Sequence, residues 1–96
     1  MKLDPKLAAA QVELGYLLSR SGDTIGAIEH FRLAVDAAPG WVDAWINLAA
    51  QLAVGGQYAD ARKAVATALK LDPENAQAKR LRDRLAQDPA AQQARP

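Results

Sequence analysis

The side chains that could carry catalysis are few in this 96-residue chain, and their spacing does not assemble a catalytic set. His30 is the only histidine, and it lies beside Phe31 within a predicted helix. Ser19 and Ser21 flank a predicted turn, where hydroxyl groups commonly hydrogen-bond to the backbone. A Ser–His–acid triad needs a histidine that reaches both of its partners. The sequence therefore predicts no catalytic residue.

The sequence does not indicate a metal or cofactor site either. The chain contains no cysteine, and carboxylates such as Asp23, Asp43 and Asp60 are scattered over predicted helix surfaces and turns. A metal site needs ligands that converge on one point. The pair Gly55–Gly56 has no adjoining lysine and hydroxyl of the kind a phosphate loop requires. We expect no metal, no cofactor and no enzymatic activity.

The charge distribution is even except at one end. The net charge is +1, but residues 79–96 carry five basic and two acidic side chains. A basic helix can bind phosphates, yet no aromatic residue is interleaved with these arginines to stack on bases. We therefore favour a solvated terminal helix over nucleic-acid binding. No apolar run approaches the ~20 residues of a membrane span, and no signal-peptide pattern is present, so a cytoplasmic location is the default expectation.

Three prolines mark a fixed period. Pro5, Pro39 and Pro73 are spaced 34 residues apart, and Lys-Leu-Asp-Pro occurs at residues 2–5 and again at 70–73. A constant period of this length indicates repeated structural units that stack on one another, because a single thin unit cannot bury its apolar face alone.

The period extends to the small and apolar residues between the prolines. Residues 8–41 superimpose on residues 42–75, and each block has two helical stretches joined by a glycine-containing turn. The equivalent pairs are Leu14 and Leu48, Gly15 and Ala49, Leu18 and Leu52, Gly22 and Gly56, Ala27 and Ala61, Phe31 and Val65, and Ala34 and Ala68. Helices approach closely only where side chains are small, so the alanines and Gly15 are expected at helix crossings.

This pattern resembles the tetratricopeptide repeat, a 34-residue helix–turn–helix unit. The matching positions are Leu14, Gly15, Ala27, Phe31, Ala34 and Pro39 in the first block, and Trp45, Leu48, Ala61, Ala68 and Pro73 in the second. Gln11 replaces the expected tryptophan of the first block, Leu18 and Leu52 replace an aromatic residue, and Ala49 replaces a glycine. The resemblance implies an all-α fold, a right-handed superhelix of antiparallel helices.

The predicted organisation is two repeats with a helix at the end. Residues 1–7 are interpreted as the stub of a preceding repeat, 8–41 and 42–75 as the repeats, 76–87 as a capping helix and 88–96 as a disordered tail. Ala78, Leu81 and Leu85 give the capping helix one narrow apolar stripe, while Lys79, Arg82 and Asp83 keep its outer face wettable. Five helices are expected, at about 7–21, 24–37, 41–54, 58–71 and 75–87.

The resemblance also implies where a partner binds, because the first helices of such repeats line a concave groove. The inward positions are Val12, Tyr16, Arg20, Asp43, Ile46, Asn47, Ala50, Gln77, Arg80 and Arg84. Their mixture of apolar and basic groups suits an extended peptide or short helix with an apolar anchor and an acidic end. For Tyr16 and Ile46, groove contact and inter-repeat packing remain open, and Asn47 is a candidate for a hydrogen bond between helices.

Two functional hypotheses follow, with nucleic-acid binding a distant third. The first is a non-enzymatic scaffold that binds a protein or peptide in the groove, and the second is a structural segment that self-associates through its exposed N-terminal end. A chaperone-binding carboxylate clamp is rejected, because of the five clamp positions only Asn47 carries the required residue. The other four positions hold Val12, Tyr16, Gln77 and Leu81.

Overall fold

The computed structural model describes residues 5–87 of the chain as five α-helices. They are α1 (Pro5–Arg20), α2 (Thr24–Ala37), α3 (Val42–Val54), α4 (Tyr58–Leu71) and α5 (Ala76–Gln87). The expected all-α repeat fold is confirmed, and no β-strand occurs within the described residues. Residues 5–7, interpreted from sequence as part of a stub, belong to the start of α1. The predicted tail, 88–96, and residues 1–4 lie outside the described residues.

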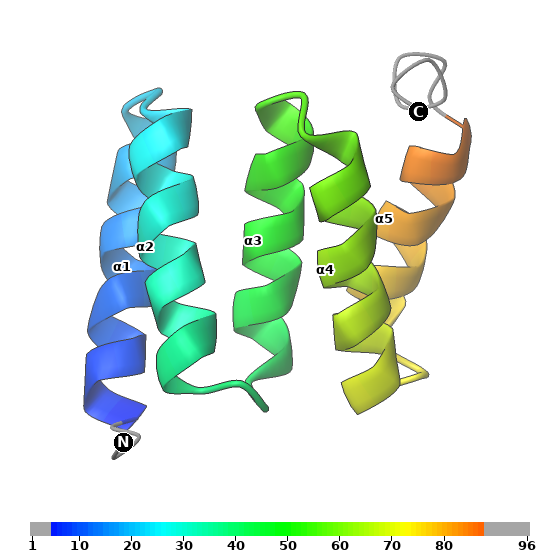
Figure 1. Ribbon diagram of the computed structural model, residues 1–96, viewed down its shortest axis with the longest axis horizontal. Helices are drawn as coiled ribbons and strands as arrows, with labels where there is room; N and C mark the ends of the chain where they lie inside the picture. The colour runs from blue at the N-terminus through cyan, green and yellow to red at the C-terminus, as the bar shows by residue number, and fades with distance from the viewer. Residues whose placement is uncertain (1–4, 88–96) are drawn as a thin grey trace.

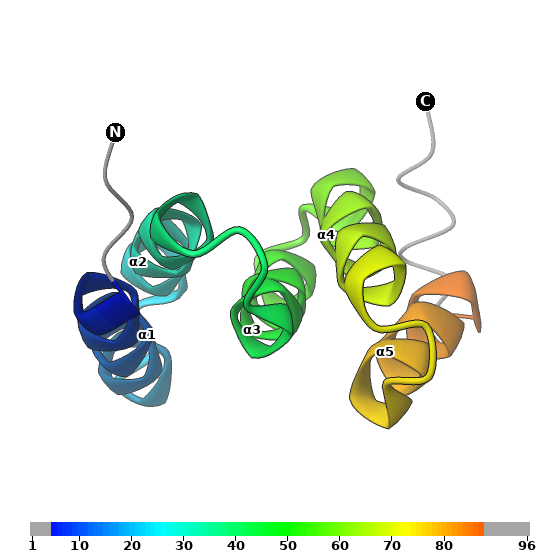
Figure 2. The same ribbon diagram turned by 90° about the horizontal axis from the view of Figure 1, so that it is seen from below.

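The helices form two layers (Figures 1 and 2). Viewed end-on, α1, α3 and α5 lie in one layer and α2 and α4 in the other, with α3 recessed between α1 and α5. Each helix packs mainly on its neighbours in sequence, and α3 also contacts α5. No described helix is both long and apolar enough to cross a lipid bilayer.

The two turns inside the repeats have the same backbone geometry. Gly22 and Gly56 occupy equivalent positions with φ of 91° and 80°, a conformation that side chains with a Cβ rarely adopt. Beside them, the amides of Asp23 and Gln57 donate to the carbonyls of Leu18 and Leu52, each at 2.8 Å. This 34-residue correspondence shows that the period in the sequence is a period in the structure.

Small residues allow the paired helices to approach closely. Ala27, Ala34, Ala61 and Ala68 are all fully buried, as the sequence predicts for crossing positions. The closest approach is at Gly15, where an added Cβ would lie 2.6 Å from a ring carbon of Phe31. Such a distance is far below van der Waals contact, so glycine is needed for α1 to lie against the Phe31 ring of α2.

Trp45 links the two repeats. Its ring is partly buried and packs against both hydrophobic clusters of the core, and its Nε1 donates to the carbonyl of Pro39 at 2.7 Å. The repeat pattern has a tryptophan at this position, and the structure adds the hydrogen bond to the loop between α2 and α3. Trp45 thus fixes the loop that sets the spacing of the repeats.

The last helix buries the stripe predicted for it. Ala78, Leu81 and Leu85 are its buried residues, and the residue just before the helix, Asn75, accepts from the amide of Ala78 through its Oδ1 at 3.0 Å. The outer charges pair locally, as Arg82 Nε with Asp83 Oδ1 at 3.1 Å. Such exposed pairs contribute little to stability, so burial of the stripe is what holds α5 in place.

We predict strong coupling between Gly15 and Phe31. Gly15→Ala should lower the free energy of unfolding, because steric overlap with the ring costs ~1–3 kcal/mol against a helix-propensity gain of about 1 kcal/mol. In the background of Phe31→Val, the same change should be stabilising. Chemical denaturation of the four proteins of the cycle measures the coupling. If the free-energy changes of Gly15→Ala and Phe31→Val are additive, the Phe31 ring does not restrict the size of residue 15.

Trp45→Ala should lower the free energy of unfolding by about 3 kcal/mol, the lower end for a large aromatic residue because the ring is only partly buried. Trp45→Phe keeps most of the packing but removes the Nε1 donor, which should cost about 1 kcal/mol. Thermal unfolding followed by circular dichroism checks both values. Equal losses for the two variants would assign the whole effect to the hydrogen bond and contradict the packing role.

Candidate functional site

The ten residues predicted for the groove all lie on α1, α3 and α5, but they are not equally accessible. We call the outward side of these three helices the first-helix face. Val12 and Ile46 are each only 7% exposed. Val12 belongs to the main core, so it offers a partner little surface and we remove it from the contact set. Arg20, Asp43, Gln77, Arg80 and Arg84 are exposed.

Tyr16 connects α1 to α3 on this face. Its hydroxyl accepts a hydrogen bond from Asn47 Nδ2 at 2.9 Å, which answers the question the sequence left open for Asn47. The Tyr16 ring meets Phe31 edge-to-face, with centroids 5.8 Å apart and planes at 84°. Tyr16 nevertheless stays 48% exposed. It is therefore a fixed aromatic surface, held in one orientation by contacts on two sides.

A hollow lies between α3 and α5. Its volume is about 210 Å³, and its lining residues are Ile46, Ala50, Gln77, Arg80, Leu81 and Arg84. The edge of Ile46 contributes to this floor even though most of its side chain is buried. The hollow thus has an apolar floor between two arginines. Sequence reasoning assigned Leu81 to the packing stripe and left it out of the groove set, although Leu81 also lines this hollow.

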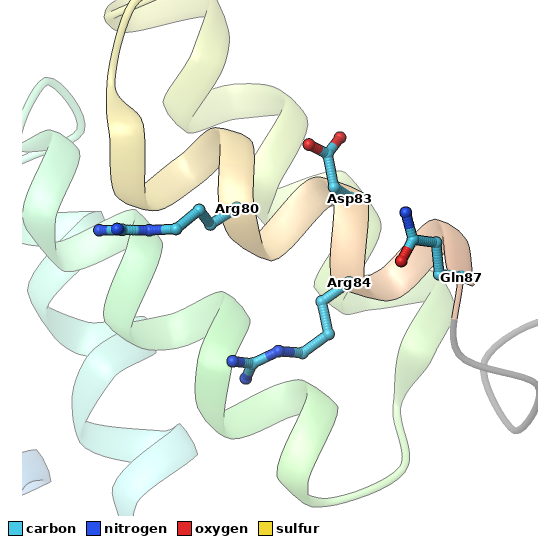
Figure 3. A pocket seen from close by; sticks show the side chains of 4 residues that line it. All are labelled: Arg80, Asp83, Arg84 and Gln87. Carbon is cyan, nitrogen blue, oxygen red and sulfur yellow. The ribbon is translucent and has the colours of Figure 1, made fainter.

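The two arginines face the same way (Figure 3). Arg80 and Arg84 extend to one side of α5, whereas Asp83 points to another side. Their four-residue spacing on a helix explains the shared direction. The same two arginines, with Asp83 and Gln87, also line a second and more open hollow of about 430 Å³. A third hollow, of about 250 Å³, has Arg84, Leu81 and Tyr58 in its lining.

Arg80 and Arg84 form no salt bridge within residues 5–87. The nearby acids are engaged elsewhere: Asp83 pairs with Arg82 at 3.1 Å and Glu74 with Lys79 at 2.6 Å. Each guanidinium therefore keeps its donors for an external acceptor. Guanidinium groups bind carboxylates through two parallel hydrogen bonds, so this end of the face is suited to an acidic ligand.

The remaining chemistry-bearing groups have structural contacts. His30 Nδ1 lies 2.6 Å from Gln11 Oε1, a part-buried contact between α2 and α1. Gln11 stands where the repeat pattern expects a tryptophan, so this polar contact replaces aromatic packing there. Among the described residues no cluster of histidine and acidic side chains could hold a metal ion.

Comparison with protein-family models gives one match that is relevant to this geometry. The tetratricopeptide repeat model matches residues 18–85, more than half of the chain. A search of curated proteins found no match. The matched span runs from the end of α1 to Leu85 of α5, so it includes most of the two-layer array described above. Together with the 34-residue period, this match shows that the chain belongs to the tetratricopeptide repeat family.

Proposed function

We propose that this chain is a non-enzymatic scaffold that binds a protein partner, as a peptide or short helix, on the first-helix face. Tetratricopeptide repeats generally mediate protein–protein interactions. The observation that carries the proposal is the pair of unpaired guanidinium groups, Arg80 and Arg84, beside the apolar floor of Ile46, Ala50 and Leu81.

The arrangement selects a ligand with two kinds of group. A carboxylate at one end would gain charge-assisted hydrogen bonds from Arg80 and Arg84. An apolar side chain would cover Ala50 and the edges of Ile46 and Leu81, where burial is worth roughly 25 cal/mol per Å². Farther along the face, Tyr16 offers an aromatic ring whose orientation is already fixed. Because the ring is already held in place, binding a ligand there costs the protein little side-chain entropy, which favours affinity.

A library of random dodecapeptides displayed on phage and selected on the wild-type protein tests the ligand class. Selected sequences should combine Asp or Glu with a large apolar residue, in contrast to the unselected library. A selection that yields basic or purely polar sequences would contradict the proposal. The best peptide then serves as the fluorescent ligand for affinity measurements by anisotropy.

The double variant Arg80→Ala/Arg84→Ala should bind the selected peptide about fivefold more weakly at low salt, because two exposed charge pairs together contribute about 1 kcal/mol. The difference should shrink at high salt through screening. Arg82→Ala is the matched control, since Arg82 lies on the same helix but pairs with Asp83 away from the hollow. Equal losses for Arg82→Ala and the double variant would contradict the site.

Tyr16→Ala should weaken the same peptide several-fold with little dependence on salt, because it removes apolar and aromatic contact rather than charge. Tyr16→Phe separates ring from hydroxyl: it keeps the ring but frees Asn47 of its 2.9 Å partner. It should therefore bind nearly as well as wild type. A loss that is equally large for both variants would show that the hydroxyl and Asn47, not the aromatic surface, carry the contact.

A further inference from the structure

Tyr58, at the start of α4, lines a hollow that the proposed function does not use. Its volume is about 250 Å³, and its lining residues are Ala50, Ala53, Val54, Tyr58, Leu81, Arg84 and Leu85. We call it the Tyr58 hollow. Val54 is 69% exposed, and Ala53 and Tyr58 are only partly buried. Apolar surface in this hollow is therefore accessible from solvent. Sequence reasoning left Ala53, Val54 and Tyr58 out of the groove set.

The Tyr58 hollow adjoins the hollow of about 210 Å³ that lies between α3 and α5, which we call the α3–α5 hollow. The two linings share Ala50, Leu81 and Arg84. On α3, the α3–α5 hollow is lined at positions 46 and 50, and the Tyr58 hollow at positions 50, 53 and 54. The second hollow is therefore displaced along α3 by about one helical turn, roughly 5 Å. Together the two hollows form one trough along α3.

The size and offset of the hollows indicate which ligand fits them. Each is smaller than the ~300–1,000 Å³ of a site that encloses a whole small molecule, so each suits one side chain of a larger ligand. Side chains at i and i+4 of a helix lie about 5–6 Å apart on one face, which matches the offset. Neighbouring side chains on one face of an extended strand are farther apart, at roughly 6.7 Å. A row of side chains on a helix also packs well into a groove between two other helices.

The charged residues place an acidic group beside these two anchor points. Arg84 lines both hollows, and Arg80 lines the α3–α5 hollow. Both arginines extend from the same side of α5 (Figure 3), and neither forms a salt bridge within residues 5–87. No acidic residue lines either hollow. A carboxylate on the side of the ligand that faces α5 would therefore meet Arg84 between its two apolar side chains.

We propose that the ligand of this face is a helix with two large apolar side chains at i and i+4, one in each hollow. An acidic side chain on the flank that faces α5 pairs with Arg84. This inference rests on the proposed function. It adds a second apolar subsite, at Tyr58, and it fixes the spacing of the two anchors.

Three alanine-rich helical peptides of equal length, labelled with fluorescein, test this spacing. The two-anchor peptide has leucines at i and i+4, and the one-anchor peptide has alanine in place of the second leucine. The shifted peptide has leucines at i and i+2, which do not share a helix face. All three carry glutamate at i+1 and i+3, so that an acid faces α5 in either direction of binding. Circular dichroism should show equal helix content for the three peptides.

Wild-type protein should bind the two-anchor peptide about tenfold more tightly than the other two, as measured by fluorescence anisotropy. Tenfold corresponds to about 1.4 kcal/mol, somewhat less than the full burial of a leucine side chain contributes.

Val54→Gln should reduce this advantage to about threefold, because it removes apolar lining from the Tyr58 hollow. The same variant should leave the one-anchor peptide nearly unaffected, since its leucine can occupy the α3–α5 hollow. Leu71→Gln is the matched control: Val54 and Leu71 are exposed aliphatic residues at the last positions of α3 and α4. Leu71 lines neither hollow, so this variant should keep the tenfold advantage.

Failure of this inference is distinguishable from failure of the proposed function. The Tyr58 subsite is wrong if the second leucine adds no affinity, or if Val54→Gln and Leu71→Gln weaken the two-anchor peptide equally. The proposed function then still stands if the phage-selected peptide depends on Arg80 and Arg84. Equal affinities of the shifted and two-anchor peptides would overturn the helical spacing. If Arg80→Ala/Arg84→Ala changes the affinity of no peptide, the proposed function fails and this inference fails with it.

Discussion

The closeness of the paired helices is the constraint on which the rest of this structure depends. Gly15 lets α1 lie against the ring of Phe31, and one added carbon would overlap that ring at 2.6 Å. In the second repeat the equivalent residues are Ala49 and Val65, both buried in the same core. The large ring of Phe31 on the second helix faces a glycine on the first, whereas the smaller Val65 is paired with an alanine. Both repeats thus fill the space between their paired helices with a different combination of residue sizes, as dense packing of the core requires.

The two-layer arrangement follows from this pairing, and so does the separation of surfaces. Once α1 and α3 are each held against their second helices, their outward sides form one face with α5. The Tyr16–Asn47 hydrogen bond then fixes α1 relative to α3 on that face. Arg80 and Arg84 remain free at its other end because the neighbouring acids pair elsewhere. The same stacking leaves Leu7, Leu14 and Leu17 of α1 exposed.

The sequence predicts the five helices and the all-α repeat fold well, because period and residue size are local properties of the chain. The five helices agree with the predicted ranges to within two residues at each end, and Ala78, Leu81 and Leu85 are buried as their spacing indicates. Side-chain partners were harder to foresee. Val12 is core rather than surface, because it lies on the side of α1 that is buried in the array, and periodicity alone does not show which side that is. The apolar hollow between α4 and α5 depends on how these two helices pack, information that neither segment contains alone.

The proposed site is tested most directly by mapping a bound ligand onto the two layers. Chemical-shift changes on adding the selected acidic peptide to isotopically labelled protein would locate the contact residue by residue. The largest changes are expected on α3 and α5, at Asn47, Ala50, Gln77, Arg80 and Arg84. Changes concentrated on the second helices, around Glu29 of α2 and Lys63 of α4, would contradict it.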